Sequence, residues 1–291
     1  MNERSFSTDK GIIRYWIGGP VTSAITLVFL PGLTADHRLF DKQVEYFEPR
    51  CGVFVWDAPG HGISRPFELS FSLADKARWL HAILEQEDIA HPILVGQSMG
   101  GYLSQAFIQC FPGEALGFVC IDSAPLKREY YTAAELWLLK HISPVYRAYP
   151  RKRLIRDGAK GCSTTEYGQA LMKSFIESYD HAEYCELAGH GYRILAEAVE
   201  LNLLYEVDCP TLLICGTEDA AGSSRRYNRE WAKRTGLPLA WIEGAGHNSN
   251  TDCPDEVNAL IAEFAGVPFE THMAQTIVEG LKCKRVETEV G

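Results

Sequence analysis

The chain has 291 residues, of which 46% are hydrophobic, and its 28 Lys and Arg against 38 Asp and Glu give a formal net charge of −10. This length predicts one large core with an insertion, and the acidic balance disfavours binding to nucleic acid or to an anionic membrane surface. No apolar run is long enough to span a bilayer, and the polar start MNERSFSTDK lacks the apolar core of a signal peptide, so we expect a cytoplasmic protein.

Cysteine usage indicates a reduced protein without a disulfide framework. The nine cysteines are odd in number and scattered, and most lie within apolar runs that are typical of buried strands. We therefore expect reduced thiols that pack as small hydrophobic side chains. No pair has C-x-x-C spacing, so the sequence predicts no metal site.

Short apolar runs alternate with helical patterns along the chain, which favours an α/β fold with a mostly parallel central sheet flanked by helices. An earlier run at residues 11–17 is expected to form an antiparallel edge strand. Loops rich in Gly, Pro, Asp or Ser follow the central runs, and ligands of open α/β sheets bind beyond such carboxyl ends. The predicted central strands are Thr26–Leu30, Val53–Trp56, Ile93–Val95, Phe118–Ile121, Thr211–Cys215 and Leu239–Ile242.

The alternation of strands and helices stops at residues 125–205, where no strand pattern occurs. Helical patterns at Ala133–His141 and Ile194–Tyr205 instead dominate this stretch. The sequence therefore predicts a helical cap, inserted between two parts of the sheet.

The rest of the chain is expected to form the core and a tail. The predicted core comprises residues 1–124 and 206–265, and a helix at Asp255–Ala265 closes it. Residues 266–291 form the predicted C-terminal tail, in which 271–282 have the pattern of one more amphipathic helix.

The stretch ILVGQSMGG places Ser98 where a predicted strand turns sharply into a helix at Tyr102–Phe111. Gly96 and Gly100 flank the serine in the pattern G-x-S-x-G, and small neighbours let the strand and the helix approach closely at a strained turn. Such a turn exposes the serine hydroxyl and directs the backbone N–H of Met99 toward the same space, as half of an oxyanion hole. A glycine-rich turn that merely contains a serine is the alternative interpretation.

A base and an acid follow later in the chain. His247, in WIEGAGHNSN, comes directly after the last predicted strand, and Asp219, in LLICGTEDAAG, comes directly after the preceding one. The order serine, aspartate, histidine is that of this class of turn. Asp122, in CIDSAP, is the competing acid, and Asp219 could instead only cap the following helix.

The second oxyanion donor is expected in the loop VFLPGLTADHRLF. Gly32 permits a tight bend there, which allows the backbone N–H of Leu33 to face that of Met99 across a substrate carbonyl. The nearby His37 and the His61 of DAPGHGIS are both expected to hold loops rather than to perform chemistry.

With these residues assembled, the chain resembles the α/β-hydrolase fold superfamily over about residues 10–265, as a capped serine hydrolase of the esterase and lipase kind. The matching motifs are LPGL, DAPGHGIS, GQSMGG, GTED and GAGH. Members often carry His-Gly before the oxyanion donor, where this chain has Pro31 and Gly32. Ser98 argues against the dehalogenases and epoxide hydrolases of the superfamily, which use an aspartate. The resemblance implies no cofactor.

This resemblance implies cleavage of a carboxylic ester or related acyl bond in a small, apolar or moderately polar molecule. Ser98 would attack the acyl carbon, His247 would transfer the proton and Asp219 would orient the imidazole, with an acyl-enzyme as intermediate. Hydrolysis of a carbon–carbon bond, and a receptor that keeps the triad without turnover, are the alternatives.

A basic cluster within the predicted cap stands out in this acidic chain. It could attract an anionic substrate or partner, although a solvated helix face is the simpler interpretation. The cluster comprises Arg147, Arg151, Lys152, Arg153 and Arg156.

Overall fold

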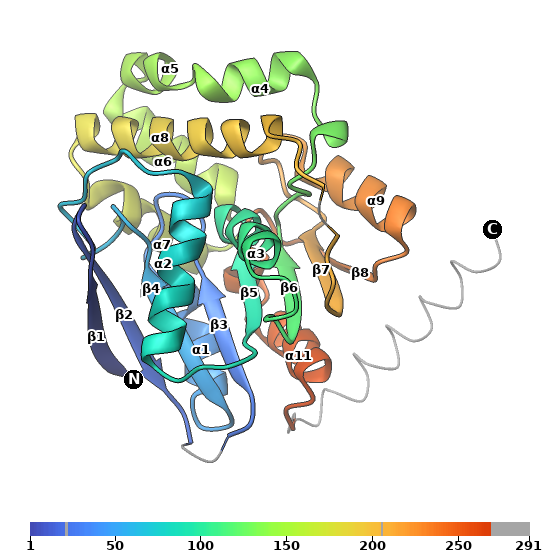
Figure 1. Ribbon diagram of the computed structural model, residues 1–291. Coiled ribbons are helices and arrows are strands. Elements are labelled where there is room, and N and C mark those ends of the chain that lie inside the picture. Colours follow the sequence, from blue (N-terminus) through green and yellow to red (C-terminus); the bar gives the residue numbers. More distant parts are fainter. Residues whose placement is uncertain (21–22, 205, 269–291) are drawn as a thin grey trace.

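The computed structural model describes residues 1–20, 23–204 and 206–268, in which an eight-stranded sheet runs through the molecule (Figure 1). Its strand order is β1-β2-β4-β3-β5-β6-β7-β8. In this order, the strands from β4 through β3 to β8 are parallel to one another, whereas β2 pairs antiparallel with β4 and with β1. The predicted fold class is therefore confirmed. The bounds are β1 Asn2–Ser7, β2 Ile12–Gly18, β3 Thr26–Leu30, β4 Gly52–Asp57, β5 Ile93–Gln97, β6 Gly117–Ile121, β7 Thr211–Gly216 and β8 Leu239–Ile242.

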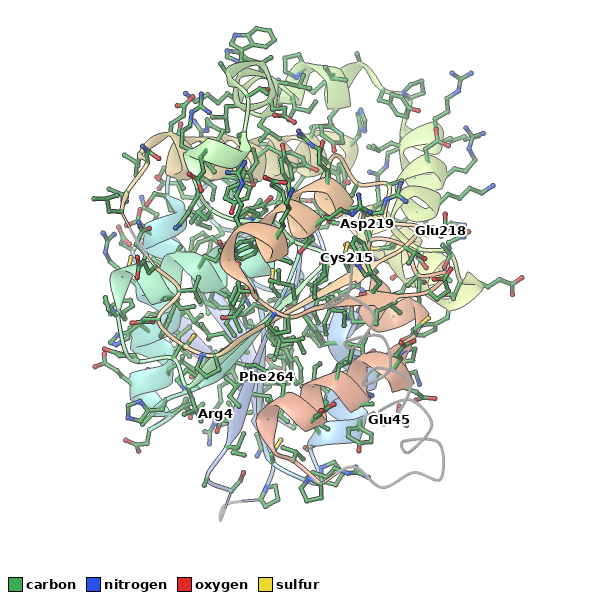
Figure 2. All side chains as sticks on the ribbon, turned by 90° about the vertical axis from the view of Figure 1, so that its right-hand side faces the viewer. Arg4, Glu45, Cys215, Glu218, Asp219 and Phe264 are labelled. Atoms are coloured by element: carbon green, nitrogen blue, oxygen red, sulfur yellow. The ribbon has the colours of Figure 1, made fainter. Side chains whose placement is uncertain are left out.

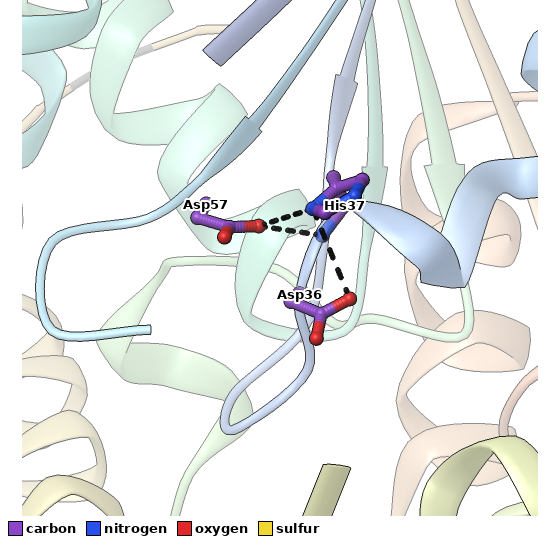
Figure 3. A group of neighbouring side chains, drawn as sticks. All are labelled: Asp36, His37 and Asp57. Atoms are coloured by element: carbon purple, nitrogen blue, oxygen red, sulfur yellow. Dashed lines mark hydrogen bonds and ion pairs between the residues drawn. The ribbon is translucent and has the colours of Figure 1, made fainter. Parts of the chain in front are cut away.

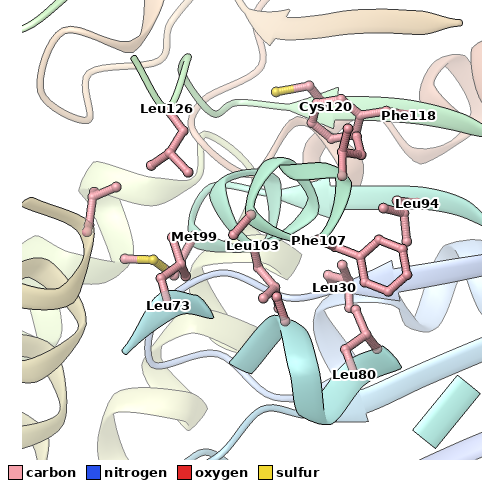
Figure 4. Close-up of a cluster of buried hydrophobic side chains, with 14 of the residues drawn as sticks. Leu30, Leu73, Leu80, Leu94, Met99, Leu103, Phe107, Phe118, Cys120 and Leu126 are labelled. Carbon is pink, nitrogen blue, oxygen red and sulfur yellow. The ribbon is translucent and has the colours of Figure 1, made fainter. Parts of the chain in front are cut away.

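Alternation along the strands divides the core into two layers. In β3, Val28 and Leu30 face one cluster of buried side chains, while Leu27 and Phe29 face the other. Helices α2 (Leu73–Gln86), α3 (Met99–Cys110) and α9 (Ser224–Thr235) contribute to the first cluster, part of which Figure 4 shows between α2 and α3. The second is covered by η1 (His37–Phe40), α1 (Asp41–Phe47) and α11 (Pro254–Ala265), and the short α10 (Ser249–Asp252) precedes α11.

Helices alone connect β6 to β7 within the described residues, and they lie beyond the carboxyl ends of the central strands (Figure 1). The long α8 crosses above α2 and α3, and α4 and α5 pack on its other side. We refer to α4 to α8 as the inserted helices; the division into core and cap domains stays a prediction. The bounds are η2 Arg128–Tyr130, α4 Ala133–Lys140, α5 Ser143–Ala148, α6 Arg151–Cys162, α7 Glu166–Glu177 and α8 His181–Glu200.

Three elements differ from the sequence-based expectation. The run at residues 11–17 lies largely in the antiparallel strand β2, but β2 is between β1 and β4 rather than at the edge of the sheet. Strand β1 was not predicted, because its residues are polar and almost all exposed at the edge of the sheet, where no apolar pattern is needed. The helix expected at Ile194–Tyr205 is the end of α8, which begins much earlier, at the N-cap Asp180, and ends at Glu200. Glycine and histidine residues within its first half obscure the helical pattern.

All eight cysteines in the described part of the chain are free thiols, whereas Cys283 lies outside it. The helix predicted at 271–282 also lies outside the described residues, as does all of the predicted tail beyond residue 268. Across the described helices, none has both the length and the apolar character needed to cross a bilayer.

Because β3 lies very close to the start of α3, we expect the stability of the fold to depend strongly on Gly100. A Cβ atom there would lie 1.8 Å from the backbone oxygen of Leu30. We expect Gly100→Ala to lower the free energy of unfolding by about 1–3 kcal/mol, as overpacking does. The control Gly161→Ala, where a Cβ meets nothing within 4 Å in α6, should leave stability unchanged or raise it. Chemical denaturation measures both, and equal effects would contradict this reason.

Candidate active site

Ser98 occupies a strained turn between β5 and α3. Its φ of 50° and ψ of −115° lie in a region that residues with a side chain rarely adopt. Gly96 must be small as well, because a Cβ there would lie 2.4 Å from backbone atoms of Gly100. The turn is fixed by the Ser123 hydroxyl, which donates to the Ser98 carbonyl at 2.7 Å. The predicted elbow is therefore present, with the Ser98 hydroxyl beyond the end of β5.

The structure brings the three predicted side chains together. Nε2 of His247 lies 2.9 Å from the Ser98 Oγ, and its Nδ1 lies 3.1 Å from both carboxylate oxygens of Asp219. Because a carboxylate only accepts hydrogen bonds, Nδ1 carries the proton and Nε2 is free to accept from the serine. Glu218, the neighbour of Asp219, is exposed and lies nearer the surface (Figure 2).

Electrostatics favour a base at His247. Burial lowers the pKa of its imidazole, but the charge and the hydrogen bond of Asp219 outweigh burial and leave that pKa raised. For Asp219, burial raises the pKa, and the charge of His247 together with hydrogen bonds brings it below its usual value. Asp219 is fully buried, while the His247 side chain is 14% exposed, so water or substrate can reach the imidazole.

Asp122 serves a different purpose from Asp219. It accepts hydrogen bonds from the backbone N–H groups of Gly216 and Ser249, both at 2.8 Å. Burial, followed by the charge of Asp219, raises the pKa of Asp122 to about 7. The carboxylate thus ties the end of β7 to the segment after His247.

Gln97 also holds the histidine loop, and sequence reasoning missed it. Its side-chain amide donates to the His247 carbonyl at 2.7 Å and to the Asn248 side-chain oxygen at 3.1 Å. A polar residue at the end of a buried strand, directly before the serine, was the available signal.

The loop after β3 lies directly beside the serine. A Cβ on Gly32 would lie 3.2 Å from the Ser98 Cβ, so only glycine leaves this space open. Within the described residues, neither the Leu33 nor the Met99 backbone N–H has a hydrogen-bond acceptor. Met99 begins α3, where the first N–H groups of a helix point outward without partners. Two unused backbone donors are therefore available near the hydroxyl.

His37 and Asp57 join the loops that follow β3 and β4, as Figure 3 shows. The imidazole Nδ1 and the backbone N–H of His37 both lie 2.8 Å from one oxygen of Asp57, while Asp36 pairs with Arg38. His61 is buried, and its Nδ1 lies 3.0 Å from the Pro59 carbonyl. Both histidines hold loops, as the sequence analysis expected.

Two groups of side chains bring possible metal ligands together within the described residues. Asp57 and Asp122 already accept hydrogen bonds from backbone N–H groups, so the carboxylates act as loop anchors and we assign no metal to them. The two groups are Asp36, His37 and Asp57, and Asp122, Cys215 and Asp219.

The basic cluster of the inserted helices does not converge on the serine. The guanidinium of Arg151 donates to the backbone carbonyls of Ile176 and Tyr179, and Arg156 pairs with Asp157. The other three members, Arg147, Lys152 and Arg153, are exposed. The simpler interpretation, a solvated helix face, agrees with this arrangement.

Comparison with known proteins agrees with the fold. A sequence model described as "Alpha/beta hydrolase family" matches residues 27–260. The chain belongs to the alpha/beta hydrolase family. As an alpha/beta hydrolase, it is similar in fold to a solved hydrolase from Pseudomonas aeruginosa, with a TM-score of 0.77, 18% identity and coverage of 91% of this chain and 98% of that one.

Two characterised relatives of this alpha/beta hydrolase are distant in sequence. An (E)-2-((N-methylformamido)methylene)succinate hydrolase from Acinetobacter baylyi is 21% identical, over 80% of this chain and 87% of its own. A 2-hydroxy-6-oxononadienedioate/2-hydroxy-6-oxononatrienedioate hydrolase from Escherichia coli is 24% identical, over 74% of this chain and 77% of its own. Hydrolases that are named for different substrates are thus similar to this one.

The opposing influences of burial and Asp219 on His247 predict that the pKa of this imidazole depends on Asp219 in this alpha/beta hydrolase. In Asp219→Asn the imidazole stays buried but loses the neighbouring negative charge, so we expect the pKa of His247 to fall below its value in the unaltered protein. Histidine NMR titration measures this change. The signal of His37, whose raised pKa depends on Asp57, is the internal control and should not move. An unchanged pKa of His247 would show that Asp219 does not control the imidazole.

Proposed function

We propose that the chain is a serine hydrolase of small molecules, in which Ser98 is the nucleophile, His247 the general base and Asp219 its orienting acid. The observation that carries this proposal is the continuous hydrogen-bond path from the Ser98 hydroxyl through the imidazole to the Asp219 carboxylate. A serine hydroxyl is a weak nucleophile until a positioned base takes its proton, and this path supplies that base.

The reaction has two halves. In the first, the Ser98 Oγ bonds to the acyl carbon while its proton moves to Nε2 of His247, and the N–H groups of Leu33 and Met99 stabilise the oxyanion. His247 then gives the proton to the leaving alcohol, whose bond to the acyl carbon breaks. In the second half, water loses a proton to His247 and attacks the acyl-enzyme, and the proton returns to the Ser98 Oγ as the acid is released.

The substrate that this arrangement favours is a carboxylic ester or a related acyl compound. We infer that the inserted helices form a cap at residues 125–205 over the site, because α8 crosses beyond the carboxyl ends of the strands. No step above requires a metal or an organic cofactor. The free thiols and the acidic net charge suit a cytoplasmic enzyme that binds neither nucleic acid nor membrane.

Cleavage of a carbon–carbon bond is the second candidate, and the Escherichia coli relative favours it. That protein's name denotes a hydrolase of 2-hydroxy-6-oxo dienedioates. The same serine, base and backbone donors would serve if the leaving group were a carbon atom that takes the proton. Assay of p-nitrophenyl esters beside a 1,5-diketone distinguishes the two candidates by the ratio of their kcat/KM values.

Removal of the nucleophile tests the main proposal. We expect Ser98→Ala to abolish labelling by a fluorophosphonate probe and to lower kcat/KM for p-nitrophenyl esters by about 10³-fold or more. Intact-mass spectrometry and steady-state kinetics measure these effects. The control Ser70→Ala changes an exposed serine and should behave as the unaltered protein. Labelling of Ser98→Ala at the original rate would overturn the assignment, and a single round of ester cleavage without turnover would favour a receptor.

The oxyanion donors predict a different kinetic effect at Gly32. A Cβ there would lie 2.3 Å from the side-chain oxygen of Gln97, so Gly32→Ala should displace the loop that carries the Leu33 N–H. Because this donor acts on the oxyanion rather than on bound substrate, we expect kcat to fall by about 10²-fold while KM changes little. A rise in KM at constant kcat would assign the loop to substrate binding instead.

A further inference from the structure

Three basic side chains lie buried near one another, apart from the triad. His61 follows β4, Lys76 lies in the first turns of α2, and His190 lies on α8. They are 2%, 3% and 5% exposed, respectively. The ring centroids of His190 and Phe71, which lies just before α2, are 4.4 Å apart, and α8 packs against α2. Gly60, next to His61, approaches Leu187 of α8, so the three side chains come from adjoining segments. The influence of the Lys76 charge on both imidazoles agrees with this placement.

These groups lack the partners that buried polar side chains normally have. Within the described residues, no carboxylate or other acceptor bonds to the Lys76 ammonium, and burial is the one influence on its pKa, which falls to about 8. Both ring nitrogens of His190 are sealed from solvent without a hydrogen-bond partner. His61, by contrast, donates its Nδ1–H to the Pro59 carbonyl, which leaves its neutral ring no further N–H to donate.

The charge state of this cluster at neutral pH is one ammonium with two neutral imidazoles. Burial and then Lys76 lower the pKa of His61 to about 3, and burial, Arg193 and Lys76 lower that of His190 to about 4. A buried ammonium without a counter-ion is costly to the folded state, and the N–H of His190, which has no acceptor, adds to that cost. An anion between Lys76 and His190 would satisfy both.

The cluster adjoins the elements that carry the two proposed oxyanion donors. The Leu33 side chain packs against Gly191 of α8, next in sequence to His190. Leu73 of α2 packs in the same buried cluster as Met99, as Figure 4 shows, and Lys76 follows Leu73 by roughly one helical turn, about 4.5 Å along the axis. Gly60, beside His61, approaches Leu187 of α8. An acyl chain that extended from Ser98 toward the side of α2 and α8 would therefore approach Lys76.

We propose that Lys76 and His190 form a subsite for a carboxylate at the far end of the acyl chain, so that the substrate is a monoester, or a related acyl derivative, of a dicarboxylic acid. This inference rests on the proposed function for the direction of the chain. The carboxylate neutralises the Lys76 ammonium, and one of its lone pairs accepts from the N–H of His190.

Binding of a dicarboxylate tests the subsite without any catalytic step. We expect millimolar glutarate to raise the Tm of the protein, whereas neutral glutaramide does not. Lys76→Met should remove this response, and Lys233→Met, which removes an exposed lysine of α9, should retain it. Because Lys76→Met deletes an unpaired buried charge, we expect it to fold and to melt no lower than the original protein without ligand. A glutarate response that is absent from the original protein, or that persists in Lys76→Met, would overturn the subsite.

Kinetics then tie the subsite to the reaction. The measured quantity is the ratio of kcat/KM for mono-p-nitrophenyl glutarate to kcat/KM for p-nitrophenyl valerate, a neutral ester of similar length. Lys76→Met should lower this ratio by about tenfold or more, as loss of a charge-assisted hydrogen bond does. His190→Phe keeps an aromatic ring against Phe71 and should lower the ratio in the same direction.

The outcomes separate the two proposals. Turnover of both esters with a ratio that neither variant changes would refute the subsite and leave the serine hydrolase intact. No turnover of either ester by the original protein, together with a glutarate response that depends on Lys76, would refute the ester hydrolase and retain an anion site.

Discussion

Two hydrogen bonds to the Asp122 carboxylate hold the proposed catalytic arrangement in register. One oxygen accepts from the Gly216 N–H at the end of β7, and the other accepts from the Ser249 N–H just beyond His247. The loops of Asp219 and His247 are therefore fixed against each other and against β6, which neighbours the strand of Ser98. Burial raises the pKa of this carboxyl to about 7. The ionised form, which accepts both hydrogen bonds, is therefore stabilised by these two N–H donors.

The histidine loop also connects the sheet to the inserted helices. The backbone N–H of Asn248 donates to the Cys162 carbonyl at the end of α6, and Asp252 accepts from the backbone N–H of Thr164 and from the side chain of Thr165, just before α7. Asp252 accepts from the Gly246 N–H as well. The segment that positions the imidazole thus also bonds to the ends of α6 and α7, so displacement of these helices would move His247.

Local patterns in the sequence were sufficient for the central strands and for the three side chains of the proposed triad. Buried parallel strands are continuous apolar runs. Ser98 follows β5 directly, and Asp219 and His247 lie in the loops that follow β7 and β8. Asp122 and Gln97 have equally conspicuous positions, but their partners are backbone groups 94 to 150 residues away. A hydrogen bond of that kind leaves no pattern in sequence, because any residue can supply the backbone group. The polar edge strand β1 was missed for a related reason, because backbone pairing with β2 requires no apolar pattern in its mostly exposed side chains.

The buried charges are distributed unevenly around the serine. On the side of β7, Asp219 pairs with the His247 imidazole and Asp122 accepts from two backbone N–H groups, so negative charge there is compensated within the protein. On the side of α2, the Lys76 ammonium has no such compensation among the described residues. The far carboxylate of a substrate would be repelled by Asp122 and Asp219 and attracted by Lys76. This uneven distribution of charge therefore also sets the direction in which such a substrate would lie. The uncompensated charge of Lys76 therefore destabilises the free protein, and binding of a carboxylate would remove this destabilisation. The same charge would favour an acyl chain that points away from Asp219.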